Sequence, residues 1–161
     1  MSKFPIKQVK RHEISYGYSN TRANLISEIR IYDKDIIITN IHKDKDLKSG
    51  SSLRKTVSSI LSNNKPAILM GDLNIKPTYK RYRILTNDLL DTATALNTKK
   101  AQLVRKTGTF LGKNLKKRDK RIDYIFVDKK NFKVLEVGLL DEKHWPAFDH
   151  LGYFARLKLL R

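Results

Sequence analysis

The stretch Ala67-Ile68-Leu69-Met70-Gly71-Asp72-Leu73-Asn74 decides how this chain folds. Its apolar run is short and lies between Pro66 and Pro77, which favours a buried strand, because a helix needs a longer periodic stretch. Side chains alternate along a strand, so Asp72 and Asn74 leave the same face just beyond the buried part. A carboxylate and an amide placed there can orient a nucleophilic water. The alternative is an ordinary turn at the strand end, since Gly, Asp and Asn are common turn residues.

The length of the chain limits the number of domains, and its net charge limits the kinds of partner. The chain has 161 residues, with 34 Lys and Arg, 16 Asp and Glu, and a formal net charge of +18. This length predicts one domain that buries roughly two thirds of its unfolded surface. The charge favours a polyanionic partner, and nucleic acid is the first candidate, because binding it releases condensed counterions. An anionic membrane surface would attract the same charge, and a basic protein can also be merely soluble.

Cysteine is absent, which excludes disulfides, thiolate metal sites and a catalytic thiol. The first residues, Met1-Ser2-Lys3-Phe4-Pro5, begin no long apolar region, and no run approaches the length of a transmembrane helix. We therefore expect a soluble, cytoplasmic protein with neither a signal peptide nor a membrane span.

Residues 26–41 predict a β-hairpin with its turn at 33–35. Its second arm ends with Asn40 and His42 on one face, so His42 has the same place on its strand as Asp72 has on the next. A single histidine at a strand end is otherwise a surface or hydrogen-bonded residue. His42 is a catalytic candidate only if its neighbours are catalytic.

Two amphipathic helices are predicted. The first covers about 51–61 and connects the hairpin to the deciding strand, which makes a β-helix-β unit. The second covers about 80–90, where Tyr82, Leu85 and Leu89 recur at helical spacing. We assign this second apolar stripe to the core.

Residues 98–121 are polar and strongly basic, and we predict a long loop with short strands. Long ordered loops in compact domains are usually functional or mobile, so this segment is our candidate for contacts to a phosphate backbone. The alternative is a solvated run of charge. The residues assigned to nucleic-acid or phosphate binding are Lys113, Lys116, Lys117, Arg118, Lys120 and Arg121.

Two further acidic positions follow. Residues 121–127 predict a strand that carries Asp123 among aromatic and branched neighbours. A carboxylate there needs an arginine or histidine partner, because a buried unpaired charge is costly. Asp149 and His150 precede the final strand, where a turn would bring both side chains to one site. The acid can hold a hard cation and the imidazole can donate a proton, although the dipeptide alone is more simply a chance occurrence.

Four motifs in this order resemble those of the endonuclease/exonuclease/phosphatase family, which has the DNase I-like fold. They are Asn40-Ile41-His42, Gly71-Asp72-Leu73-Asn74, the strand at 121–127, and Asp149-His150-Leu151-Gly152. Four ordered motifs are more specific than any one of them. The resemblance implies an α/β fold, a partial DNase I-like β-sandwich with flanking helices, and hydrolysis of phosphodiesters or phosphomonoesters with Mg²⁺, or with Mn²⁺ in its place.

The resemblance also implies roles for the matching residues. Asp72 resembles the family's water-activating carboxylate, and Asn74 its ligand for water and phosphate. Asp123 resembles the acid that orients a histidine. His150 resembles that histidine, which contacts phosphate or transfers a proton.

Two more residues are matched in the same way. Asp149 resembles a metal-site carboxylate, and His42 resembles the second catalytic histidine of the DNase-like and sphingomyelinase-like branches. Asp72 must stay ionised to activate water, and we expect the surrounding positive charge to depress the pKa of carboxylates at the site.

The chain departs from the family pattern at its start, which aligns near the middle of the family domain. We therefore expect a single truncated domain over residues 1–161 that lacks the N-terminal half. The missing strands carry a metal-binding Asn and Glu, and neither Glu13 nor Glu28 clearly replaces that Glu. We expect the apolar inner face at 36–41 and 68–70 to be uncovered. A homodimer, a partner fragment or an incomplete reading frame would each account for that face.

The predicted function is a metal-dependent phosphoesterase, most simply a nuclease that cleaves phosphodiester bonds by attack of an activated water, with DNA favoured over RNA. We expect little activity from this chain alone. One alternative is a noncatalytic nucleic-acid-binding remnant of such an enzyme. Another is a phosphatase or lipid phosphodiesterase of the same family, because all these classes share the motifs.

Overall fold

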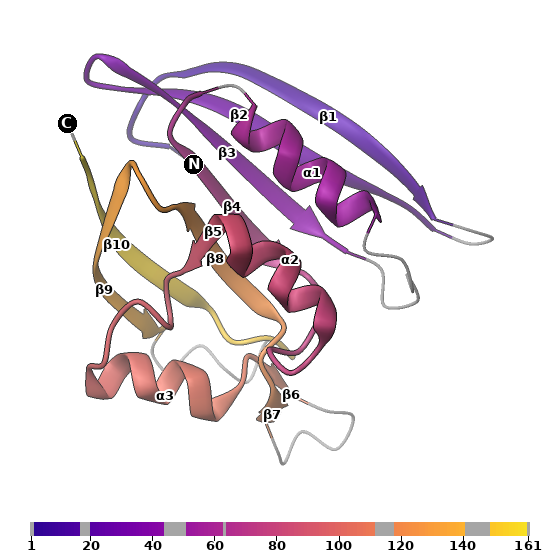
Figure 1. Cartoon of the computed structure of the whole chain (residues 1–161), viewed down its shortest axis with the longest axis vertical. Coiled ribbons are helices and arrows are strands. Elements are labelled where there is room, and N and C mark those ends of the chain that lie inside the picture. Colours follow the sequence, from indigo (N-terminus) through magenta and orange to yellow (C-terminus); the bar gives the residue numbers. More distant parts are fainter. Residues whose placement is uncertain are drawn as a thin grey trace.

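The computed structural model describes residues 2–16, 20–43, 51–62, 64–111, 118–140 and 149–160. Its largest element is a six-stranded sheet in the order β1-β2-β3-β4-β8-β5 (Figure 1). Within it β3 and β4 are parallel, and the other neighbouring strands are antiparallel. The strands of this sheet are β1 (Ile6–Tyr16), β2 (Asn20–Ile31), β3 (Lys34–His42), β4 (Ala67–Asp72), β5 (Leu89–Asp91) and β8 (Asp123–Asp128).

The predicted β-helix-β unit is confirmed as β3, α1 (Ser51–Leu61) and β4. Parallel neighbours need a crossover connection, which α1 supplies. The apolar stripe of α1 is buried in one cluster with Ile37 and Ile41 of β3. Ile36 belongs to a second cluster, because adjacent side chains of a strand point to opposite faces. The central sheet therefore has apolar side chains on both faces.

The predicted hairpin is confirmed as β2 and β3, with its turn at Tyr32 and Asp33. This turn lies earlier than the predicted 33–35, because Asp35 belongs to β3 and is ion-paired across the sheet. Its Oδ1 lies 2.5 Å from Nε of Arg30, and its Oδ2 lies 2.9 Å from Nζ of Lys7.

A second layer covers the other face of the large sheet. It consists of a two-stranded antiparallel sheet of β9 (Phe132–Leu139) and β10 (Tyr153–Leu159), with α3 (Lys99–Thr107) beside it (Figure 1). Ile36 of β3 is 1% exposed and lies in one cluster with Val134 and Val137 of β9, and Ile38 and Ile68 pack against the same cluster. The inner face that we expected to be uncovered is thus covered in part. The architecture is the predicted α/β sandwich with flanking helices.

The helix α3 corrects our prediction of a loop over 98–121. Thr98 caps it, since its Oγ1 accepts a hydrogen bond of 3.2 Å from the backbone N–H of Ala101. Ala101 and Val104 are completely buried one turn apart, and the many charges around them hide this short apolar stripe in the sequence. The predicted short strands of the segment are present as β6 (Phe110–Leu111) and β7 (Arg118–Lys120).

The helix α2 (Lys80–Asp88) ends before the predicted 80–90 range does. Leu89 opens β5, which pairs with β8 at the edge of the large sheet. Leu85 and Leu89 are both buried, as the spacing predicts. Among the described residues, no helix combines the length and apolar character that crossing a membrane requires.

Candidate active site

Strand register brings three of the predicted site residues together. The carboxyl ends of the parallel strands β3 and β4 coincide, and His42 pairs with Asp72. The antiparallel strand β8 begins beside them, and its first residue, Asp123, pairs with Asp72 from the other side. Residues directly opposite one another share a face of the sheet. His42, Asp72 and Asp123 are therefore neighbours at one sheet edge.

Gly71 allows the end of β4 to lie close against β3. Its φ is 123°, and a Cβ at this position would lie 2.0 Å from the backbone oxygen of Ile41. Only glycine adopts this conformation at low cost and leaves the necessary space. Gly71 and Asp72 are thus the last residues of β4 and not part of a turn after it, and the strand needs glycine at position 71.

Asn74 holds the carboxylate of Asp72 in place. Its backbone N–H donates to Oδ1 of Asp72 over 2.8 Å, and its Nδ2 donates to Oδ2 over 3.1 Å. The same Nδ2 donates to the backbone oxygen of Lys43 over 2.7 Å. Asn74 has a φ of 50°, a left-handed conformation that Asn tolerates. On the outer side, Nε2 of His42 lies 3.4 Å from Oδ2 of Asp72, and the imidazole is 56% exposed.

Asp123 and His150 form the second pair of the site. Nδ1 of His150 lies 2.8 Å from Oδ2 of Asp123, which gives this acid the partner that its position requires. His150 also forms an isolated β-bridge with Phe110, and the two rings meet edge to face with their centres 5.0 Å apart. The histidine is therefore held from two sides.

Thr109 is a positioning residue to which the sequence analysis assigns no role. Its buried Oγ1 accepts hydrogen bonds of 3.1 Å from the backbone N–H groups of both Ile122 and Asp123. Its backbone oxygen accepts a 2.7 Å hydrogen bond from the N–H of Leu151, next to His150. One residue thus fixes the backbone on both sides of the acid-histidine pair. The sequence signal for it is the Thr109-Phe110 pair shortly before the strand that carries Asp123.

Burial raises the pKa of Asp72 above its ordinary value of 3.8. The hydrogen bond from the N–H of Asn74 lowers it, the charge of Asp123 raises it, and His150 and His42 lower it. Our expectation of a depressed pKa is therefore wrong for Asp72. The physical reason is that loss of solvation acts directly on this carboxylate and outweighs the positive groups around it.

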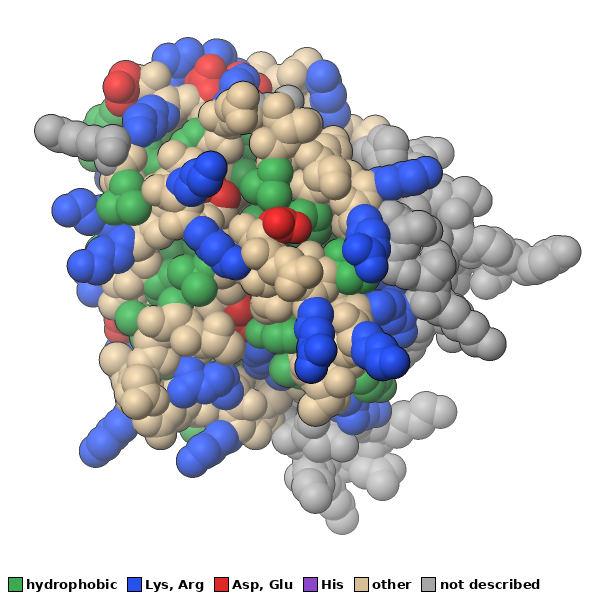
Figure 2. Space-filling view, viewed as in Figure 1, with side chains coloured by type: hydrophobic (Ala, Val, Ile, Leu, Met, Phe, Trp, Pro, Cys, Tyr) green, Lys and Arg blue, Asp and Glu red, His purple; other side chains and the backbone are tan. Residues whose placement is uncertain are grey.

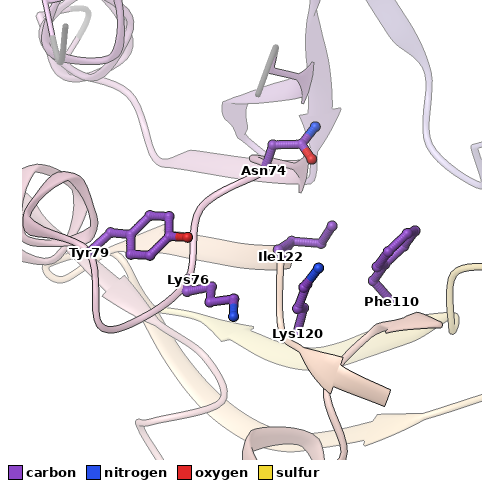
Figure 3. Close-up of a pocket in the computed structure, with 6 residues that line it drawn as sticks. All are labelled: Asn74, Lys76, Tyr79, Phe110, Lys120 and Ile122. Carbon is purple, nitrogen blue, oxygen red and sulfur yellow. The ribbon is translucent and has the colours of Figure 1, made fainter. Parts of the chain in front are cut away.

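A pocket of about 350 Å³ opens beside the site (Figure 3). Two of the residues that line the pocket contact catalytic candidates: Asn74 donates a hydrogen bond to Asp72, and the ring of Phe110 packs against His150. In Figure 3 the hydroxyl of Tyr79 is directed toward the space between the labelled side chains. The residues that line the pocket are Asn74, Lys76, Tyr79, Phe110, Lys120 and Ile122.

The model of one protein family, described as the Endonuclease/Exonuclease/phosphatase family, matches residues 1–146. The chain belongs to the endonuclease/exonuclease/phosphatase family. This confirms the resemblance inferred from the four motifs, and it makes the chain a relative of hydrolases that act as phosphatases or nucleases. No curated protein sequence matches the chain significantly.

Solved structures of this family share the fold. An endonuclease/exonuclease/phosphatase family protein from Leptotrichia buccalis is 23% identical, with a TM-score of 0.74 over 96% of this chain and 62% of that one. A mannosyl-6-phosphatase from Bacteroides thetaiotaomicron is 20% identical, with a TM-score of 0.70 over 99% and 68%. The human Nocturnin catalytic domain with a bound sulfate anion is 17% identical, with a TM-score of 0.69 over 98% and 60%.

These similarities show the DNase I-like fold and no more, because the sequence identities are low. The chain spans less than two thirds of the Leptotrichia structure and of the human structure.

Enzymes of the endonuclease/exonuclease/phosphatase family generally use a divalent metal, for which Mg²⁺ is the expected ion here. The described part of the chain contains no group of three or more His, Cys, Asp or Glu that would hold a metal. Asp149 is exposed beside His150, whereas Glu28 is ion-paired with Lys65 at 2.7 Å. Mg²⁺ demands near-octahedral oxygen ligation. The described residues do not complete such a site.

Arg121 corrects our assignment of phosphate-binding residues in this family member. It is 4% exposed, and its Nη2 lies 2.5 Å from Oδ2 of Asp91 inside the protein. Its guanidinium also lies 4.6 Å from the ring centre of Tyr124. Tyr82 donates to the same Asp91 oxygen over 2.6 Å. Arg121 therefore neutralises a buried acid and anchors the start of β8, and its guanidinium does not face solvent.

The remaining basic residues of that assignment have different positions. Figure 2 shows Lys and Arg side chains scattered over the described part of one face, with fewer acidic side chains among them. Lys120 lines the pocket, and Arg118 lies in β7, where its backbone alone is described. Outside the described residues are Lys113, Lys116 and Lys117.

Proposed function

We propose that this chain is a phosphoesterase of the endonuclease/exonuclease/phosphatase family, and specifically a nuclease that cleaves phosphodiester bonds with an activated water. One observation carries the proposal: two carboxylate-histidine pairs from distant parts of the chain lie at one sheet edge, with Asp72 and Asp123 adjacent. The net charge of +18 supports nucleic acid as the substrate class, and we favour DNA.

Asp72 is the proposed base. Its carboxylate accepts a proton from water while the water oxygen attacks phosphorus, and a raised pKa makes it a stronger base than an exposed aspartate. Both hydrogens of the Asn74 amide are engaged, one by Asp72 and one by the backbone of Lys43. The amide oxygen of Asn74 is left as an acceptor. We therefore assign Asn74 to orienting the attacking water.

His150 is the proposed acid and phosphate contact. Asp123 engages its Nδ1, which leaves Nε2 for the substrate. As the bond from the water oxygen to phosphorus forms and the bond to the leaving oxygen breaks, a proton on Nε2 passes to that leaving oxygen. The exposed imidazole of His42 is placed to contact a nonbridging oxygen from the Asp72 side.

Family membership keeps Mg²⁺ or Mn²⁺ as the expected cofactor, with Asp149 as the one ligand assigned to it. The described residues alone do not complete a site for this ion. We accordingly expect slow cleavage by this chain alone.

A nicking assay on supercoiled DNA with Mg²⁺, with the protein in excess, tests the proposal. Asp72→Ala and His150→Ala should each lower the cleavage rate by about 100-fold or more. Asp88→Ala is the matched control, because Asp88 is exposed at the end of α2. Equal rates for the parent and both site variants would refute the assigned roles.

A second candidate is a noncatalytic nucleic-acid-binding remnant of such an enzyme, which would keep the basic surface and need no metal site. Salt-sensitive binding without cleavage, unchanged in Asp72→Ala, would identify it. A phosphatase or lipid phosphodiesterase is the third, since a mannosyl-6-phosphatase is among the structural relatives. Hydrolysis of phosphomonoesters in preference to DNA would identify that class.

A further inference from the structure

We propose that Tyr124 is a positioning residue of the active site, whose buried hydroxyl holds Asn74 in the geometry that Asp72 needs. The inference rests on the proposed hydrolysis at Asp72. It gives a role to a side chain that lies behind the site and acts on the proposed base only through Asn74.

Tyr124 lies on the face of the sheet opposite to the catalytic candidates. It pairs with Gly71, whereas the residue before it, Asp123, pairs with Asp72. Successive side chains of a strand point to opposite faces, so the ring of Tyr124 is directed away from the site. It is 1% exposed and belongs to the core cluster that α1 covers, where it stacks on Phe126 with ring centres 5.3 Å apart. The ring therefore has a fixed place in the core.

The hydroxyl of Tyr124 connects the segment after Asn74 with the segment before β8. Its oxygen lies 2.7 Å from the backbone oxygen of Ile75 and 2.9 Å from that of Arg121. Burial raises the pKa of Tyr124 above its ordinary value of 10.0, so the hydroxyl keeps its proton. One proton serves one acceptor at a time, and the shorter contact assigns it to Ile75.

Asn74 is the middle residue of a three-residue arch that is tied down at both ends. At one end the backbone N–H of Leu73 donates to the backbone oxygen of Ile122 over 2.9 Å. At the other end the oxygen of Ile75 accepts from Tyr124. Between these anchors the φ of Asn74 is 50°, which residues other than glycine rarely adopt unless the surrounding structure imposes it. The two anchors therefore maintain the hydrogen bonds of Asn74 to the proposed base.

Tyr124→Phe removes only the hydroxyl, and Tyr82→Phe is its matched control. The Tyr82 hydroxyl also donates to a buried acceptor, the carboxylate of Asp91, over 2.6 Å. The ring centres of the two tyrosines are 5.8 Å apart. Both variants thus lose one internal hydrogen bond in the same aromatic cluster, and only Tyr124→Phe releases the oxygen of Ile75. Urea denaturation compares their stabilities.

The backbone amide of Asn74 reports this geometry without substrate. In Tyr124→Phe its hydrogen should exchange with solvent about 10-fold or more faster than in the parent, because the arch opens more often. The pKa of Asp72 should rise, since the N–H of Asn74 lowers it. Neither quantity should change in Tyr82→Phe. Single-turnover cleavage should fall about 10-fold or more in Tyr124→Phe with KM retained, because the water and the base are misaligned while the substrate still binds.

Asn74→Gly separates positioning from packing. Glycine adopts a φ of 50° at little cost, so the arch no longer depends on its anchor. Tyr124→Phe should therefore raise the pKa of Asp72 less in the Asn74→Gly background than in the parent. Equal changes in the two backgrounds would show that Tyr124 acts through packing and would overturn the proposal. So would an Asn74 amide that exchanges at the same rate in Tyr124→Phe and in the parent.

The parent chain supplies one measurement that needs no variant. The buried hydroxyl proton of Tyr124 should exchange slowly enough to give a signal in the ¹H spectrum, and a rapidly exchanging proton would exclude the proposed hydrogen bond. These spectra are recorded without substrate, so a chain that cleaves nothing can still show the dependence of Asn74 on Tyr124. Conversely, cleavage that requires Asp72 but keeps the parent's rate in Tyr124→Phe would support the nuclease and reject the positioning role.

Discussion

Nδ1 of His150 lies 2.8 Å from Oδ2 of Asp123, although 27 residues separate them in sequence. The contact forms because β8 begins at Asp123 and because His150, just before β10, forms a β-bridge with Phe110 of the short strand β6. It fixes which nitrogen of the imidazole is presented to the substrate. The chemistry proposed for His150 depends on this contact.

Asp123→Asn should leave the fold intact and lower hydrolysis by roughly 100-fold or more, because an amide no longer holds the imidazole in one tautomer. Single-turnover cleavage rates measure the loss, and ¹⁵N shifts of the His150 ring report the tautomer. A variant with the parent's rate and an unchanged ring spectrum would show that the pair is not functional.

The carboxyl of Asp72 should titrate above 3.8 in the metal-free protein, because burial disfavours its charged form. The folded protein then binds this proton more tightly than the unfolded chain does. Its contribution to stability is fully present below pH 3.8 and is lost as the pH rises through the folded pKa. Carboxyl ¹³C shifts measure this pKa.

Removing the neighbouring charge with Asp123→Asn should move the pKa of Asp72 downward, since Asp123 contributes to raising it. An Asp72 that titrates below 3.8 in the parent would contradict the burial argument.

Arg121→Met should destabilise the protein by about 3–5 kcal/mol, because it leaves the carboxylate of Asp91 buried without its cation. Urea denaturation measures the change in the free energy of unfolding. Arg83→Met is the matched control, since Arg83 is exposed on α2, and it should change stability by less than about 0.5 kcal/mol. Similar losses in both variants would argue against the buried ion pair.

Thr109→Val should cost about 1–3 kcal/mol, because the N–H groups of Ile122 and Asp123 lose their acceptor. Thr109→Ser keeps the oxygen and should retain the His150 ring spectrum of the parent, whereas the valine variant should not. If valine and serine shift that spectrum equally, Thr109 acts through packing and does not position the pair.

The sequence predicts much of the site because its signals are local. Alternation along two strands is enough to place His42 and Asp72 at strand ends, and the helix between the strands makes them parallel. The need of Asp123 for a partner also follows from its apolar neighbours alone. The sequence does not reveal α3, because only Ala101 and Val104 mark its buried side among many charges.

The sequence by itself determined which amide, carboxylate and imidazole side chains lie at the ends of the apolar strands. Only the tertiary structure decided three other features. Arg121 forms a buried ion pair with Asp91, Thr109 accepts a hydrogen bond from the backbone N–H of Asp123, and burial raises the pKa of Asp72. The physical reason is that strand periodicity is a property of neighbouring residues. Burial and ion pairing, in contrast, depend on segments that meet only when the chain has folded.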